Sequence, residues 1–171
     1  LEIVEWGKGA SEAVTKALLR ERVDLVLMAG FLRLYRFPEE FSGRVLNIHP
    51  ALLPAFGGKG MWGRHVHEAV VKSGVKVTGC TVHFADLAYD RGPVVLQRTC
   101  PVFFEDTPET VAARVFELVY SYLMRLDENL GVQPELAESA STSVDGKQVR
   151  LKLRRAVKFH NGDPLTSADV K

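Results

Sequence analysis

The chain opens with amphipathic stretches that alternate with short apolar runs. Residues 11–22 (SEAVTKALLRER) repeat apolar side chains at helical spacing, which predicts a helix with one buried face. The runs at 24–30 (DLVLMAG) and 44–50 (RVLNIHP) are apolar without alternation. Such runs are typical of strands that are buried on both faces of a parallel sheet.

The same patterns continue to about residue 126. They predict a helix at 64–72 that ends at Gly74, strands at 75–84 and 93–103, and a helix that opens at Thr107–Pro108 and runs through 126. The order of these elements predicts an α/β fold with a mainly parallel sheet and flanking helices.

The last third of the chain has a different pattern. Residues 131–145 are small and polar, which favours a linker or an edge segment. Asp145–Gly146 is a hairpin turn signal, and QVRLKLRR (148–155) alternates apolar with basic side chains as a half-exposed strand does. We therefore expect a C-terminal appendage that contains a β-hairpin.

Composition and charge narrow the classes of partner. The 171 residues carry 22 Lys+Arg against 21 Asp+Glu, so the formal net charge is +1. This balance predicts no nucleic-acid partner, and no apolar stretch approaches the ~18 residues of a membrane span, so no membrane partner is expected. Two cysteines, Cys80 and Cys100, are too few for a disulfide framework or a zinc site. They indicate a reducing, cytoplasmic setting, with Cys80 as a small buried apolar residue.

One group of side chains could carry chemistry. Asn47 and His49 lie two apart at the end of a predicted strand, so both project from the same face. Ligands of parallel α/β sheets bind beyond the carboxyl ends of strands. Asp90 follows in a later loop, and a nearby carboxylate would raise the pKa of the His49 imidazole. An amide, an imidazolium and a carboxylate together suit nucleophilic attack on a carbonyl group.

Other candidates are weaker. Residues 56–63 (FGGKGMWG) lack the order of a phosphate-binding P-loop and favour a flexible loop near the site, with an anion-binding nest as the alternative. His65 and His67 point apart on the predicted helix, so no metal site is expected. His83 alternates with apolar neighbours and is predicted to be structural.

The run NIHPALLPAFGGKGMWGRHVHEAVVKSGVKVTGCTVHFADLAYDRGPVVLQ resembles phosphoribosylglycinamide formyltransferases, the folate-dependent enzymes of purine synthesis. The stretches VDLVLMAGFLRLY and PVFFEDTPETVAARVFE fit the same family. The resemblance covers residues 1–118. It implies formyl transfer from 10-formyltetrahydrofolate, as cosubstrate and without a metal, to the amine of glycinamide ribonucleotide.

The resemblance also implies roles for particular residues. Asn47 and His49 would stabilise the tetrahedral oxyanion, and Asp90 would keep His49 protonated and help proton transfer through water. The folate pocket would be formed by Leu32, Arg33, Leu34 and Tyr35, whose backbone holds the pterin, and by the loop that contains Asp86, Leu87 and Ala88.

The resemblance has limits at both ends. Leu1 aligns inside the family's domain, so we expect the opening strand and the glycine-rich loop that binds the substrate phosphate to be missing. Their loss would impair formyl transfer. It would also leave sheet edges open to pairing between copies of the chain. Residues 119–171 instead resemble the N-terminal part of peptide-type solute-binding proteins of ABC importers. The chain is thus expected to be a chimera of two truncated fragments, 1–118 and 119–171.

Three functions stay open at this point. The first is the impaired formyltransferase. The second is a non-enzymatic chimeric domain or interaction module, in which one helix crosses the junction and the basic strand at 149–155 adds to the open sheet edge. The third is a formyltetrahydrofolate hydrolase, which shares the same trio, although HPALLPAFGGKGMWG favours the transferase.

Overall fold

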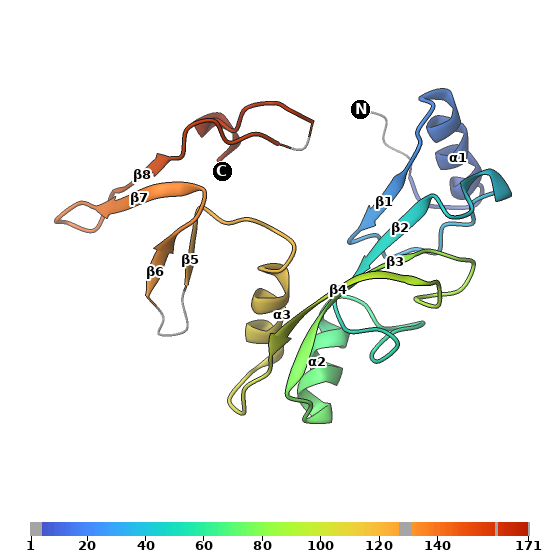
Figure 1. The fold of residues 1–171 in the computed structure, drawn as a ribbon, viewed down its shortest axis with the longest axis horizontal. Helices are drawn as coiled ribbons and strands as arrows, with labels where there is room; N and C mark the ends of the chain where they lie inside the picture. The colour runs from blue at the N-terminus through green and yellow to red at the C-terminus, as the bar shows by residue number, and fades with distance from the viewer. Residues whose placement is uncertain (1–4, 127–130, 160, 171) are drawn as a thin grey trace. The chain divides into compact units, whose positions relative to one another are not determined.

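The computed structural model describes residues 5–126, 131–159 and 161–170. The chain divides into two compact units, Leu1–Val119 and Tyr120–Lys171. Figure 1 shows the helices and the four-stranded sheet of the first unit and the two hairpins of the second. Within the described residues, no helix is long and apolar enough to cross a membrane.

The first unit has an α/β fold, as the sequence predicts. Its elements are α1 (Ala10–Arg20), β1 (Val26–Ala29), the 3-10 helix η1 (Glu39–Phe41), β2 (Val45–His49), α2 (Arg64–Ser73), β3 (Val77–Phe84), β4 (Val94–Pro101) and α3 (Pro108–Phe116). The strands lie in the order β1-β2-β3-β4. The β1–β2 pairing is parallel, whereas β2–β3 and β3–β4 are antiparallel, so the sheet is mixed.

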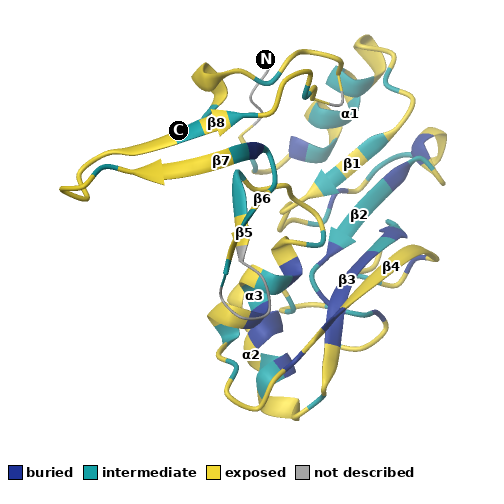
Figure 2. Cartoon of the chain, turned by 60° about the vertical axis from the view of Figure 1, so that its left-hand side comes forward, coloured by how far each residue is buried: buried dark blue, intermediate teal, exposed yellow. Residues whose placement is uncertain are grey.

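Two apolar clusters hold the unit together. One joins α2 and α3 to β3 and β4, and its buried members are Val70, Cys80, Cys100, Val102, Val111 and Val115. Both cysteines are unpaired and buried, which confirms the expectation for Cys80. The other cluster is centred on Tyr35, Phe41 and Val45 and includes apolar side chains of α1 and β1. Figure 2 shows that β3 is mostly buried and β4 mostly exposed.

Strand β1 departs from its prediction. It alternates in burial instead of being buried on both faces, because Leu25 and Leu27 are 55% and 57% exposed. Val26 and Met28 pack in the second cluster with side chains of α1. No described strand pairs with the far side of β1, so β1 is an edge strand of the sheet.

Helix α3 is shorter than predicted. Thr107 caps its start and Pro108 occupies the first turn, as the sequence indicates. The helix ends at Phe116, however, and residues 124–126 form β5. The backbone N–H groups of Leu136 and Ala137 donate to the carbonyl oxygens of Tyr122 and Leu123, so this segment is extended and paired. The predicted helix across the junction is therefore wrong.

The second unit consists of two hairpins and a 3-10 helix. Its elements are β5 (Met124–Leu126), β6 (Val132–Pro134), β7 (Ala137–Thr142), β8 (Val149–Leu153) and η2 (Ser167–Asp169). The Asp145–Gly146 turn joins β7 to β8, as predicted. Residues 131–145 contain β6 and β7, each in a two-stranded sheet, so the edge-segment alternative fits and the linker does not; β8 pairs with β7.

Candidate functional site

Strand β2 presents Asn47 and His49 to its neighbour β3. In the antiparallel register, Asn47 lies opposite His83 and His49 lies opposite Thr81. Directly opposed residues share a face of the sheet, so the four side chains gather on one side. His49, Thr81 and His83 are all buried. The period-2 geometry expected for Asn47 and His49 is thus present, and β3 adds two polar side chains to it.

His83 contacts the Asn47 carboxamide. Its Nδ1 lies 2.9 Å from the Phe84 carbonyl oxygen, and its Nε2 lies 3.1 Å from Asn47 Nδ2. A carbonyl oxygen can only accept, so His83 Nδ1–H is the donor there and Nε2 accepts from the Asn47 amide. This bond fixes the orientation of the Asn47 carboxamide and uses one of its two N–H groups.

Asp90 lies between the two histidines. Its Oδ2 is 3.5 Å from His49 Nδ1 and its Oδ1 is 3.6 Å from His83 Nε2. The Gly58 backbone N–H also donates to Oδ2, at 2.9 Å. Asp90 has a φ of +56°, in the left-handed region that Asp tolerates better than most residues. The structure therefore brings together the three residues that the sequence singled out, although Asp90 comes from a distant loop.

The environment of Asp90 favours its carboxylate form. Burial opposes ionisation, but the His83 ring, whose Nε2 lies 3.6 Å from Oδ1, the hydrogen bond from the Gly58 N–H and the nearby His49 ring lower the pKa of Asp90 below its usual value. Asp90 is accordingly an acceptor at neutral pH.

The pKa of His49 differs from the sequence prediction. Burial, the largest effect, lowers the pKa of the His49 imidazole below its usual value, although Asp90 and the Phe56 carbonyl act in the raising direction. The rise in pKa that the sequence predicts from Asp90 is present, but the lowering by burial is larger, because the ring is only 3% exposed. At neutral pH the site therefore holds a neutral imidazole beside a carboxylate.

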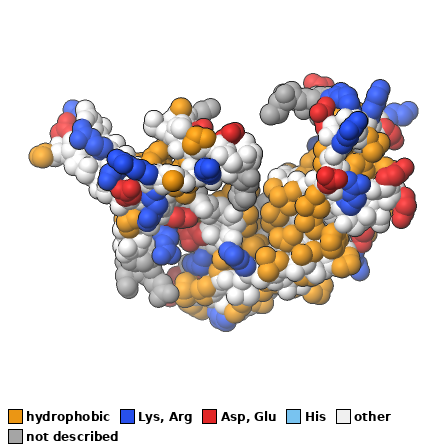
Figure 3. All heavy atoms as spheres, turned by 45° about the horizontal axis from the view of Figure 1, so that its top comes forward, with side chains coloured by type: hydrophobic (Ala, Val, Ile, Leu, Met, Phe, Trp, Pro, Cys, Tyr) orange, Lys and Arg blue, Asp and Glu red, His pale blue; other side chains and the backbone are white. Residues whose placement is uncertain are grey.

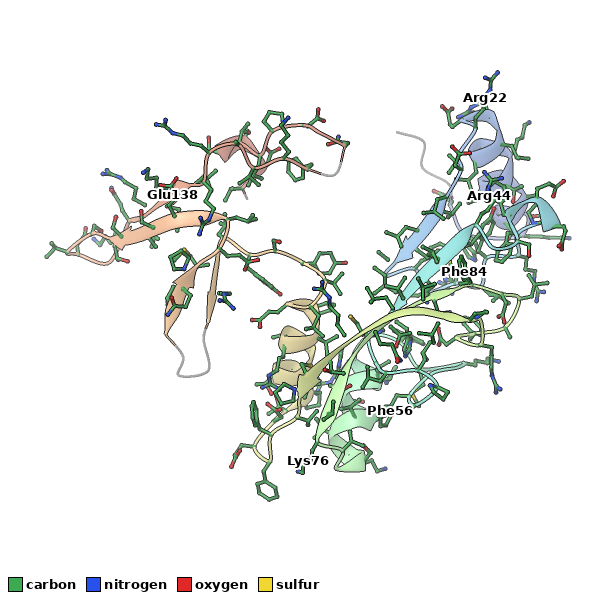
Figure 4. All side chains as sticks on the ribbon, in the orientation of Figure 1. Arg22, Arg44, Phe56, Lys76, Phe84 and Glu138 are labelled. Carbon is green, nitrogen blue, oxygen red and sulfur yellow. The ribbon has the colours of Figure 1, made fainter. Side chains whose placement is uncertain are left out.

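A buried hydroxyl shapes the loop after β2. Thr81 Oγ1 donates to the Ala51 carbonyl at 2.6 Å and accepts the Leu53 N–H at 3.0 Å. Gln97 Nε2 donates to the same hydroxyl and to the Leu53 carbonyl, both at 3.0 Å. These bonds tie the start of the loop to β3 and β4, which leaves its next residues, from Phe56 onward, beside His49 and Asp90. Figure 4 labels Phe56 on this loop.

The predicted folate-binding residues lie in two loops. Leu32 and Arg33 are exposed after β1, and Leu34 is half-buried. The Tyr35 ring is buried in the second cluster with its hydroxyl 2.8 Å from Thr15 Oγ1, so it offers only backbone to a ligand. Asp86 accepts the Ala88 N–H in a tight turn, and Leu87 is 59% exposed between them.

Sequence patterns missed the part that His83 plays. They placed it correctly inside a strand, but its contacts to Asn47 and Asp90 depend on the β2–β3 register. The period-2 spacing of Thr81 and His83 is the only signal that points to a shared polar face. Among the residues that the structure describes, no group of His, Cys, Asp or Glu side chains could hold a metal ion.

An α/β fold in which a half-buried Asn and Asp gather with a buried His describes a class of site suited to carbonyl chemistry. The family model for formyl transferases matches residues 6–126. The chain therefore belongs to the formyl transferase family.

Individual relatives point the same way. A chloroplastic phosphoribosylglycinamide formyltransferase from Vigna unguiculata is 44% identical over 128 residues, which are 72% of this chain and 40% of the relative. The enzyme from Mycobacterium tuberculosis is 44% identical over 60% of this chain and 46% of its own length. A solved structure, glycinamide ribonucleotide transformylase 1 from Symbiobacterium toebii, has a TM-score of 0.60 and 40% identity over 66% of this chain and 52% of that chain.

The chain spans less than half the length of these curated relatives. Residues 131–171 match a different model, that of the bacterial extracellular solute-binding proteins, family 5 middle. The two parts of the chain are thus similar to two separate families.

Proposed function

We propose that the first unit catalyses formyl transfer from 10-formyltetrahydrofolate to the amine of glycinamide ribonucleotide. The observation that carries this proposal is the continuous set of contacts from Asn47 through His83 and Asp90 to His49. The names of the relatives supply the acceptor and the formyl group, the family resemblance supplies the folate donor, and the cluster supplies groups that such a reaction needs.

The reaction begins when the substrate amine attacks the formyl carbon. A C–N bond forms, and the formyl oxygen becomes an oxyanion. One Asn47 N–H goes to His83, so the other can donate to that oxyanion. Preorganised donors of this kind stabilise the tetrahedral intermediate more than the planar substrate.

The attacking nitrogen must also lose a proton. His49 Nδ1 and Asp90 Oδ2 form a pair of acceptors 3.5 Å apart. We assign them to take this proton, with His49 becoming an imidazolium that the Asp90 carboxylate stabilises. The proton then returns to the folate nitrogen as its bond to the formyl carbon breaks. In this proposal Asp90 stabilises the proton after transfer and does not keep His49 charged beforehand.

For the folate, we propose the loops after β1 and β3. Leu32, Arg33 and Leu34 would contribute backbone groups and exposed side chains, and Tyr35 only backbone. Asp86, Leu87 and Ala88 would form the opposing turn, whose geometry the Asp86 carboxylate sets.

The test compares formyl transfer by the wild-type chain with His49→Ala and Asp90→Asn. Removal of a general base lowers kcat by about 10²–10⁴-fold. Asn should keep the left-handed backbone of Asp90 while removing its charge. His65→Ala is the matched control, because the His65 side chain is 58% exposed on α2.

Three results would overturn the proposal. Wild-type activity in His49→Ala would exclude the assigned base. Release of tetrahydrofolate at the same rate without glycinamide ribonucleotide would indicate a hydrolase. If the chain shows no turnover and no calorimetric binding of 10-formyltetrahydrofolate, the result would support a non-enzymatic domain.

A further inference from the structure

The two ring nitrogens of His49 have different surroundings. Nε2 lies 2.8 Å from the Phe56 carbonyl oxygen, whereas Nδ1 faces Asp90. Because a carbonyl oxygen only accepts hydrogen bonds, Nε2 must carry a proton. In the neutral ring this leaves the lone pair on Nδ1. The backbone of the loop after β2 therefore decides which nitrogen of His49 can take a proton.

The same loop also holds Asp90. Two residues after Phe56, the Gly58 N–H donates to Asp90 Oδ2 at 2.9 Å. This is the carboxylate oxygen that lies 3.5 Å from His49 Nδ1. A single turn, Phe56–Gly58, thus binds the imidazole through a carbonyl and the carboxylate through an N–H.

The conformation of this turn depends on its residue types. Phe56 and Gly58 have φ values of +55° and +99°, both in the left-handed region. Gly57 lies between them, and a Cβ added there would come 2.5 Å from Leu53 Cδ2 and 3.2 Å from the Asp90 Cβ. A larger residue at 57 must displace the end of the Leu53 side chain and press on the Asp90 Cβ, or shift the turn itself.

We propose that the Phe56–Gly58 turn is a positioning segment that sets the tautomer of His49 and the place of Asp90 together, so that Nδ1 is the nitrogen of His49 that exchanges a proton with substrate. This inference rests on the proposed function for its catalytic consequence. Its structural part, the tautomer, stands on the contact between His49 Nε2 and the Phe56 carbonyl alone. The proposal also assigns a function to the start of the glycine-rich FGGKGMWG segment, which the sequence patterns predict only as a loop near the site.

The decisive measurement is ring ¹⁵N NMR of the wild-type chain at a pH where His49 is neutral. The His49 signals are assigned by comparison with His49→Gln. We expect a protonated Nε2 and an unprotonated Nδ1. A protonated Nδ1 would overturn the proposal. Since this measurement needs no substitution in the turn, it decides the tautomer whether or not turn variants fold.

A variant then tests the positioning. Gly57→Ala should move His49 toward the other tautomer and lower kcat by about 10–100-fold, with a smaller change in KM, because small misplacements near reacting atoms have effects of this size. Gly7→Ala is the matched control, since Gly7 has open space around it and no positive φ. An unchanged tautomer and an unchanged kcat in folded Gly57→Ala would overturn the positioning role.

The two proposals fail separately. If the wild-type chain has no formyl transfer but shows the expected tautomer, and Gly57→Ala shifts it, the proposed function fails and the structural assignment stands. If transfer is present and the tautomer is reversed, the assignment fails and the function stands.

Discussion

His67 on α2 is a buried imidazole outside the proposed site. Its ring is 3% exposed and packs edge-on against Phe116. Among the described residues, its Nδ1 has no hydrogen-bond partner. Burial is the larger effect and the charge of His49 the smaller, and both lower the pKa of His67 below its usual value. The folded protein therefore holds this ring neutral.

This environment predicts loss of stability in mild acid. As pH falls below about 6.5, the unfolded chain binds a proton on His67 that the folded chain does not, so the free energy of unfolding decreases. His67→Leu removes this difference in proton binding, and we expect its Tm to fall less than that of the wild type between pH 7 and pH 5. Thermal unfolding at several pH values measures the effect.

His65→Leu is the control on the same helix, because the exposed His65 ring has no such burial. His49 contributes a pH dependence of the same sign, so the slope should decrease without vanishing. Parallel wild-type and His67→Leu curves would contradict the expectation.

At the scale of elements, the loop between β4 and α3 depends on one ion pair. Arg114 of α3 donates from Nη1 to Asp106 Oδ2 at 2.8 Å and from Nη2 to Oδ1 at 2.9 Å. Arg114 Nη1 also donates to the Pro101 carbonyl at the end of β4. The hydrogen bonds from Arg114 are the main reason that the pKa of Asp106 is lowered to about 2. Such a bidentate pair of hydrogen bonds contributes more to the free energy of unfolding than a typical surface ion pair.

Asp106→Asn should destabilise the first unit by about 2 kcal/mol, because it leaves Arg114 without its charged partner. In the wild type this contribution is complete above the unfolded pKa of Asp, about 3.9, and is lost as pH falls toward 2. Urea unfolding at pH 7 measures the loss in Asp106→Asn, and its repetition at pH 2 measures the pH dependence in the wild type. Glu105→Gln, at an exposed neighbour, is the control, and equal stability of Asp106→Asn and wild type at pH 7 would refute the argument.

The end of α3 shows how far local patterns reach. The start of the helix at Thr107–Pro108 is a local feature and occurs as predicted, with a capping box at Thr107 and the buried Val111 and Val115 on one face. In the sequence the apolar stripe continues through Val119 and Tyr122, but β-branched and aromatic residues also favour strands. Backbone bonds with 136–137 decide in favour of extended structure there, and those partners are distant in the sequence.

At the scale of the whole molecule, each unit is defined by its own pairings. We propose a boundary between residues 118 and 119; the compact units divide one residue later, after Val119, and the two family matches end at 126 and begin at 131. In the first unit, β4 is an edge strand of eight residues. Its side chains Val94, Val95 and Leu96 are about half exposed, and Figure 3 shows hydrophobic side chains gathered on this unit.

An exposed, apolar edge strand can pair with another chain. We therefore propose that copies of this chain associate through β4, which predicts a concentration-dependent dimer in sedimentation velocity. Leu96→Lys should shift the protein to monomer, because a charge on an edge strand disfavours pairing. Val144→Lys, at a fully exposed position of the second unit, should leave association unchanged. A wild-type chain that is monomeric at all concentrations would rule the proposal out.

By itself, the sequence determined the α/β class, most element positions and the candidates Asn47, His49 and Asp90, since these follow from local periodicity, turn residues and motif resemblance. Tertiary structure alone decided the mixed sheet, the end of α3 and the role of His83. It also decided the protonation of the site, because burial outweighs the attraction of Asp90 for an imidazolium. Strand register and desolvation depend on residues far apart in the chain, and no local pattern encodes them.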